Sequence, residues 1–224
     1  QGVSSAASDV YKRQVDECAP FENVYTLALR GLHDRAMNAS NNMNDRKEML
    51  QEALMAQRQM LVDAIGKRAE DIPQAFTPYK EVLDVYDQGL ELPDDVTIIW
   101  PDDNYGYMKR LSSPKEQKRS GRSGVYYHSS YLGKPHDHLW MNTTSPTLMY
   151  EELRKAYDLT ADRIWLLNAG DIKSCEFAVD YFLTMAFDID SFSFERAANY
   201  RTEWLCGMLG DDYRAVSYTH LTLP

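Results

Sequence analysis

Three short apolar runs in this sequence each end on carboxylate, amide or imidazole side chains. The groups that follow the runs are Asp102, Asp103 and Asn104 after 96–100, His128 after 125–127, and Asn168 and Asp171 after 164–167. Carboxylates and imidazoles transfer protons, and amides hydrogen-bond to hydroxyl groups. A buried parallel strand reads as a continuous apolar run, and α/β barrels gather their chemistry at the carboxyl ends of such strands. The pattern therefore predicts an enzyme site.

The elements that would position these residues alternate along the chain. We expect strands at 24–29, 96–100, 124–128 and 163–168, with a short extended piece at 73–78 between two prolines. Helices are expected at 45–66, from about 79 to Gly89, from Ser145-Pro146 to Asp158, at 175–187 and near 195–209. This alternation is typical of a parallel sheet with right-handed crossovers. We predict an α/β fold, namely a partial (β/α)8 TIM-type barrel of about five βα units.

Composition and charge exclude several function classes. The 224 residues are 44% hydrophobic and 12% aromatic, enough to bury a core, and the net charge of −10 argues against nucleic-acid binding. No apolar run is long enough to span a bilayer, and no signal-peptide pattern stands at the start. The three cysteines, Cys18, Cys175 and Cys206, lack the spacing of a zinc or redox site. We expect a globular chain that binds no membrane and no cofactor.

The two ends of the chain differ from its body. Residues 1–14 and 216–224 have no periodic relation to the rest and resemble translated adapter sequence. We therefore expect the barrel fragment to occupy residues 20–210, without an internal repeat or a linker.

Several sequence blocks together resemble the xylan α-1,2-glucuronidases of glycoside hydrolase family 115. The blocks begin at Leu29 (LRGLHD), Ala75 (AFTPYKEV), Trp100 (WPDDNYGY), Glu116 (EQKRSG), Gly124 (GVYYH), Leu139 (LWMNTT) and Arg163 (RIWLLNAGDIK). They follow one another in order from about residue 20 to residue 210, which makes the set much more specific than any one block. The resemblance implies a large multidomain hydrolase whose central barrel removes glucuronic acid, or its 4-O-methyl form, from xylan with inversion. This chain would hold the middle of that barrel. The longer protein would be secreted or periplasmic in a bacterium, and a homodimer is one assembly open to it.

The resemblance also implies roles for individual residues. Glu81 matches a proposed catalytic carboxylate, and Asp102, Asn104, His128 and Tyr131 match pocket residues. An inverting glycosidase needs one protonated carboxyl and one carboxylate roughly 6.5–9.5 Å apart, and we expect Glu81 and Asp102 to be this pair. The residue pattern by itself has other interpretations: Glu81 as an ordinary first-turn helix carboxylate, and Asp102 with Asp103 as a turn after Pro101.

Further residues are candidates for binding glucuronoxylan or its oligosaccharides. Asn168 and Asp171 suit sugar hydroxyls, although Asn-Ala-Gly-Asp also forms a strand-to-helix turn. Arg30 and Lys173 suit the carboxylate of a uronate, unless they form surface ion pairs. With Asp103 and His33 they complete the predicted substrate-binding set, and all of these side chains should point to one end of the sheet.

Two other functions remain open at this stage. A non-catalytic carbohydrate-binding barrel would keep the aromatic residues Trp100, Tyr105, Tyr131 and Trp140 without needing both carboxylates. A metal-dependent barrel hydrolase is compatible with His33, Asp34 and His128, although no tight ligand motif is present. His128 is also open to interpretation as a core histidine. Glu81 together with Asp102 favours hydrolysis over binding alone, and we expect no metal, because no tight ligand spacing is present.

Overall fold

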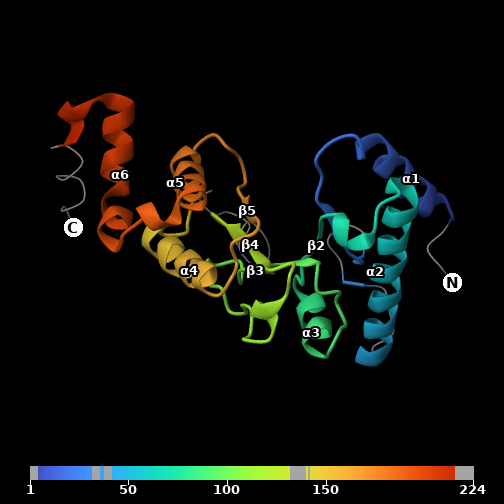
Figure 1. Ribbon diagram of the computed structural model, residues 1–224. Helices are drawn as coiled ribbons and strands as arrows, with labels where there is room; N and C mark the ends of the chain where they lie inside the picture. The colour runs from blue at the N-terminus through green and yellow to red at the C-terminus, as the bar shows by residue number, and fades with distance from the viewer. Residues whose placement is uncertain (1–4, 32–35, 38–41, 132–139, 141, 215–224) are drawn as a thin grey trace. The chain divides into compact units, whose positions relative to one another are not determined.

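The computed structural model describes residues 5–31, 36–37, 42–131, 140 and 142–214 (Figure 1). The chain divides into two compact units. The first comprises Gln1–Trp100 and Ser112–Gly124, and the second comprises Pro101–Leu111 and Val125–Pro224. Each unit is described by itself below.

Five strands form one parallel sheet in the sequential order β1-β2-β3-β4-β5. Their bounds are β1 Tyr25–Leu27, β2 Gln74–Phe76, β3 Thr97–Pro101, β4 Ser123–His128 and β5 Trp165–Asn168. In the first unit Thr26 lies beside Ala75, and in the second unit His128 lies beside Asn168. Parallel strands in chain order with helices between them are the topology of a (β/α)8 barrel, of which the described residues supply five strands. The predicted fold class is confirmed.

The helices between and after these strands are those that the apolar periodicity predicts, to within a few residues. They are α2 Met43–Ile65, α3 Glu81–Asp87, α4 Pro146–Asp158, α5 Glu176–Phe187 and α6 Phe194–Leu209. Short 3-10 helices lie at Ala69–Asp71, Glu116–Lys118, Ile189–Ser191 and Asp211–Tyr213. Helix α1, Ser5–Cys18, was not predicted from the sequence; it packs against α2, and its Val15 is buried. Among the described residues no helix is both long and apolar enough to cross a membrane.

The core of the first unit is built on the apolar stripe of α2. Leu50, Leu54 and Leu61 of this helix are fully buried with Phe76 of β2 and Val85 of α3. The helix ends are fixed by local chemistry: the Asn42 side chain accepts a hydrogen bond from the backbone N–H of Asn44, and Gly66 closes the helix with φ +72°. The stripe thereby holds β1 and β2 in register, and with them the segments that follow these strands.

In the second unit an aromatic layer supports β4 and β5 from one side. The Tyr127 ring of β4 and the Trp165 ring of β5 lie with their centroids 6.4 and 5.7 Å from the Phe182 ring of α5. Because side chains alternate along a strand, Tyr126 and His128 of β4 point to the opposite face from Tyr127. The layer thus fixes which residues of β4 are available for a site.

Candidate active site

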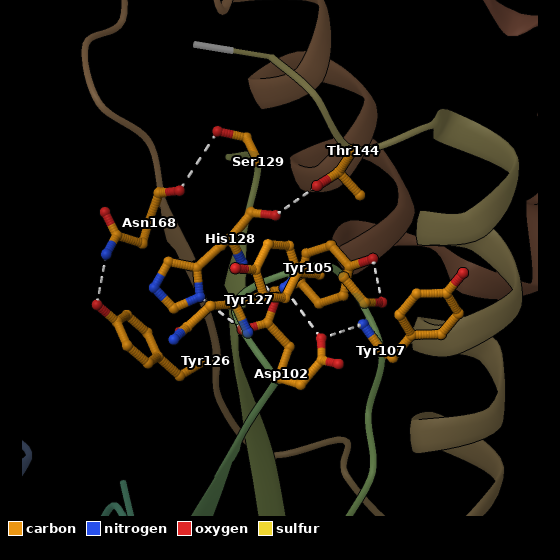
Figure 2. Close-up of polar contacts among 12 residues, drawn as sticks. Asp102, Tyr105, Tyr107, Tyr126, Tyr127, His128, Ser129, Thr144 and Asn168 are labelled. Atoms are coloured by element: carbon orange, nitrogen blue, oxygen red, sulfur yellow. Dashed lines mark hydrogen bonds and ion pairs between the residues drawn. The ribbon is translucent and has the colours of Figure 1, made fainter. Parts of the chain in front are cut away.

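Asp102, the first residue after β3, has both carboxylate oxygens occupied by nearby N–H groups. Its Oδ1 lies 2.6 Å from His128 Nδ1 and accepts the backbone N–H of Asn104 at 3.1 Å. Its Oδ2 accepts the backbone N–H of His128 at 3.2 Å, and its own N–H donates to the carbonyl of Tyr126 at 3.0 Å (Figure 2). The Asp102 side chain has 0% of its surface exposed. The turn that the sequence allows is present, in the bond to Asn104, and the same carboxylate also binds a histidine.

His128 ends β4 and is held on several sides. Its side chain is 2% exposed. The Tyr126 ring lies edge-on at 4.9 Å between centroids, and the Tyr131 ring lies edge-on at 5.7 Å. The hydroxyl of Thr144 donates to the His128 carbonyl at 3.0 Å. The imidazole is therefore fixed in place by a carboxylate and two aromatic rings.

Asn168, at the end of β5, joins this cluster through Tyr126. Its side-chain Nδ2 donates to the Tyr126 hydroxyl at 2.6 Å, and its backbone carbonyl accepts the backbone N–H of Ser129 at 3.1 Å. Figure 2 shows Asp102, His128, Tyr126 and Asn168 together at the ends of the strands. We refer to these four residues as the strand-end cluster. It combines a carboxylate, an imidazole, a phenol and an amide, which are groups that bind sugar hydroxyls and transfer protons.

The loop from Asp103 to Lys109 is shaped by the Asp103 carboxylate. Its Oδ1 accepts the backbone N–H groups of Tyr105 at 2.9 Å and Tyr107 at 3.1 Å, and Lys109 Nζ lies 2.8 Å from Oδ2. Burial, the largest single effect, acts to raise the pKa of Asp103. The hydrogen bonds from Lys109, Tyr105 and Tyr107 together outweigh burial and lower this pKa below its usual value. In the second unit Asp103 therefore fixes the conformation of the loop from Asp103 to Lys109.

Two buried hydrogen bonds also hold the loop from Asp103 to Lys109 in place. The Tyr127 hydroxyl donates to the carbonyl of Gly106 at 2.8 Å, and Glu152 of α4 accepts the backbone N–H of Met108 at 2.7 Å. Burial first, and then the charges of Asp102 and Glu152, raise the pKa of Tyr127, so its hydroxyl stays a proton donor. Gly106 has φ +90°, and a Cβ there would lie 2.9 Å from Thr144 Cγ2 and 3.0 Å from the Tyr127 hydroxyl. Only glycine fits this position without displacement of its neighbours.

In the first unit the Glu81 carboxylate is bound by a guanidinium. Arg30, three residues beyond β1, donates from Nε to Oε1 at 3.1 Å and from Nη2 to Oε2 at 3.0 Å. The two side chains are 20% and 18% exposed, and the Arg30 guanidinium also lies 5.4 Å from the centre of the Tyr79 ring. Glu81 begins α3 directly after Lys80, whose φ of +51° is rare for a residue with a side chain. This two-point contact fits a carboxylate that accepts at both oxygens.

The remaining predicted residues lie in different surroundings. Asn104 follows Asp102 with φ +71°, and Tyr131 contacts His128 as described. Asp171 is exposed. The Lys173 side chain is 91% exposed, and its Nζ lies 4.0 Å from Oε1 of Glu176, the first residue of α5. His33 and Asp34 lie outside the described residues. The described part of the chain contains no group of three or more His, Cys, Asp and Glu side chains arranged to hold a metal ion.

Two residues of this region were missed by the sequence analysis. Tyr126 lies two positions before His128, and the two-residue period of a strand is a signal that could have placed both on one face. Glu152 is buried in α4 and is bound at 2.6 Å by Lys155 Nζ as well as by the Met108 N–H. Nothing in the helical pattern around Glu152 distinguishes it from a surface carboxylate, so no signal was available for it.

Comparison with known proteins agrees with this chemistry. The sequence model of Glycosyl hydrolase family 115 matches residues 4–221. Among solved structures, one similar chain is a family GH115 4-O-methyl-α-glucuronidase with specificity for decorated arabinogalactans. It is 40% identical, with a TM-score of 0.88 over 96% of this chain, and this chain spans 29% of its length. A search of curated proteins gave no match. The chain belongs to glycoside hydrolase family 115.

Proposed function

We propose that this chain is part of an inverting α-glucuronidase that removes (4-O-methyl)glucuronic acid side chains from xylan. The observation that carries the proposal is the 40% identity over 96% of the chain to a 4-O-methyl-α-glucuronidase. The chain spans 29% of that enzyme, so the activity is that of a longer protein in which residues 20–210 are a barrel segment.

In this proposal Glu81 is the carboxylate that activates water. Its two oxygens both accept hydrogen bonds from Arg30. A neutral carboxyl carries a proton on one oxygen and cannot accept at both in this way, whereas a general base must be ionised. The geometry of the pair therefore favours the base over the acid for Glu81.

Three members of the strand-end cluster, His128, Tyr126 and Asn168, bind the glucuronic acid. Imidazole, phenol and amide groups match sugar hydroxyls in hydrogen-bonding capacity, and Asn104 and Tyr131 lie directly beside Asp102 and His128. The Tyr105 side chain on the neighbouring loop is 51% exposed and offers an aromatic face to the polysaccharide.

A second polysaccharide is a candidate because of one observation. The similar solved enzyme has specificity for decorated arabinogalactans. The bond that is cleaved would again be an α-glucuronidic bond, as the name of that enzyme states, and only the leaving chain would differ.

A hybrid enzyme tests the proposal. Residues 4–221 of this chain replace the matched part of the solved 4-O-methyl-α-glucuronidase, and sugar release is measured on glucuronoxylan and on decorated arabinogalactan. We expect 4-O-methylglucuronic acid to be released from xylan, and proton NMR to show the β-anomer first, because inversion at an α-linkage gives the β-product. The 224-residue chain alone should show no turnover, since its sheet lacks the other strands of the barrel.

Two controls make the result decisive. The hybrid with Glu81→Gln should still fold and unfold cooperatively, with a melting temperature lowered only by the weakened Arg30 contact, but lose activity, which separates turnover by this site from contamination. A folded hybrid that releases no uronic acid from either polysaccharide would contradict the proposal. Release of the α-anomer first would contradict the inverting mechanism alone.

A further inference from the structure

We infer that Asp102 is a positioning residue that keeps a proton on Nδ1 of His128, so that Nε2 of His128, and not the Asp102 carboxylate, meets the sugar. The inference rests on the proposed function for the identity of the ligand. It replaces the sequence-based expectation that Asp102 is itself one of the two reacting carboxylates.

The Asp102 carboxylate is already hydrogen-bonded at both oxygens and is closed off from solvent. It accepts from His128 Nδ1, from the His128 N–H and from the Asn104 N–H, and its side chain is 0% exposed. A general base must lie within hydrogen-bonding reach of the proton that it removes. Three of its roughly four lone-pair sites are taken by its own neighbours on β4 and the loop after β3, and the buried side chain leaves no open approach for water to the remaining one.

The same contacts determine which imidazole nitrogen carries the proton. A carboxylate is only an acceptor, so the 2.6 Å contact requires a proton on Nδ1. In the neutral imidazole this leaves the lone pair on Nε2, and Nε2 makes no hydrogen bond within the described part of the chain. In this neutral form Nε2 presents an acceptor, which suits a sugar hydroxyl.

The surroundings prevent the ring from turning over. The Tyr126 and Tyr131 rings stand edge-on to the imidazole at 4.9 and 5.7 Å, and Thr144 binds the His128 carbonyl at 3.0 Å. A group that is to orient a ligand must itself be held by packing and hydrogen bonds behind it. Asp102 supplies the hydrogen bonds, and the tyrosines supply the packing.

A double-mutant cycle in the hybrid enzyme separates the two roles of Asp102. Asp102→Asn should lower kcat/KM by about 10–100-fold, as is typical when the carboxylate behind a working histidine is removed in metal sites. In a His128→Ala background the same substitution should change kcat/KM less than about twofold, because Asp102 acts only through His128. Equal losses in both backgrounds would overturn the inference and return Asp102 to a reacting role.

Two further readouts distinguish positioning from general damage. Azide or formate added to Asp102→Ala should not restore turnover, whereas such ions can replace a missing reacting carboxylate; restoration would overturn the inference. The control is Asp180→Asn, which removes an equally short 2.6 Å contact, from the Tyr200 hydroxyl, between α5 and α6. It should leave kcat/KM unchanged, and a matching loss there would mean that the Asp102 effect is a stability effect.

The proton position can be measured without any activity. Nitrogen-15 NMR of the histidine-labelled 224-residue chain, recorded at a pH where the imidazoles are neutral, should show His128 with its proton on Nδ1, whereas free neutral histidine prefers the Nε2–H form. His128→Gln identifies the signal, and substitution of each of the other four histidines identifies it by elimination. An Nε2–H ring in the native chain would overturn the inference. An inactive hybrid would instead count against the proposed function, and the NMR result would stand independently of it.

Discussion

The guanidinium of Arg30 spans both carboxylate oxygens of Glu81, at 3.1 and 3.0 Å, across 51 positions of sequence. From the sequence alone Arg30 suits the uronate and Glu81 suits the chemistry. The structure pairs the two residues with each other, so that under the proposed function the role of Glu81 depends on Arg30.

Glu81→Gln should reduce hydrolysis of xylan in the hybrid enzyme by about 10²–10⁴-fold, because the amide cannot accept a proton from water. A substrate with an acidic phenol as leaving group should lose activity to the same extent, since water must still be activated. The measurement is kcat/KM on both substrates. A much smaller loss on the phenol substrate would assign the acid role to Glu81 instead of the base role.

Arg30→Lys should lower kcat by about 10-fold and leave KM nearly unchanged. Lysine keeps the charge but loses one of two hydrogen bonds to Glu81, and a hydrogen bond to a charged group contributes about 1.5–3 kcal/mol. Steady-state kinetics of the hybrid enzyme measure both constants. A rise in KM at constant kcat would show that Arg30 binds the uronate, as the sequence predicts. Arg68→Lys, in the exposed pair with Asp71, is the matched control and should change neither constant.

Asp103→Asn should destabilise the chain at neutral pH by at most about 1 kcal/mol, because it loses the Lys109 contact, and solvent screens that contact at a lysine that is 74% exposed. The pKa of Asp103 is lower in the folded protein than in the unfolded chain, so its contribution is complete above the ordinary aspartate pKa of about 3.9 and is lost as the pH falls below it. The difference in melting temperature between the two proteins should therefore shrink in acid. A difference that stays constant down to pH 2 would exclude this ionisation as its cause. Asp211→Asn, in an exposed pair with Arg214, should show little effect at any pH.

Gly106→Ala should destabilise the chain by about 1–3 kcal/mol, because it combines a strained φ with close contacts to Thr144 and Tyr127. Gly89→Ala is the matched control: its φ is +89°, but a Cβ there meets nothing within 4 Å. Thermal unfolding of the two variants separates the steric cost from the cost of the backbone conformation. Equal losses in the two variants would mean that the loop moves freely to accommodate a methyl group.

Much of the fold could be predicted from the sequence because its strands are short apolar runs bounded by turn residues. The run ending at Trp100 and the proline after Ser145 place β3 and α4 almost to the residue. Strand β1 is shorter than predicted, at Tyr25–Leu27. The apolar run at 24–29 is longer than the three residues that pair with β2, and the sequence alone does not show where strand pairing ends.

The site could be predicted as a set of residues but not as a set of contacts. Asp102, His128 and Asn168 were all found from their positions after apolar runs. The bond between Asp102 and His128 depends on the register of β4 against the end of β3, which the Asp102 N–H sets by donating to Tyr126. The complete burial of the Asp102 side chain likewise follows from tertiary packing.

The contact between Glu152 and the Met108 backbone has a consequence for how sequences of this kind diverge. The carboxylate binds the main-chain N–H of position 108, which every amino acid except proline provides. Position 108 is then free to change its side chain within the limits of packing, while position 152 must keep an acceptor of the same reach. In a comparison of many relatives we expect exchange among apolar side chains at the buried position 108 beside a constant carboxylate at 152, because the loop is held there through its backbone and not through its side chain.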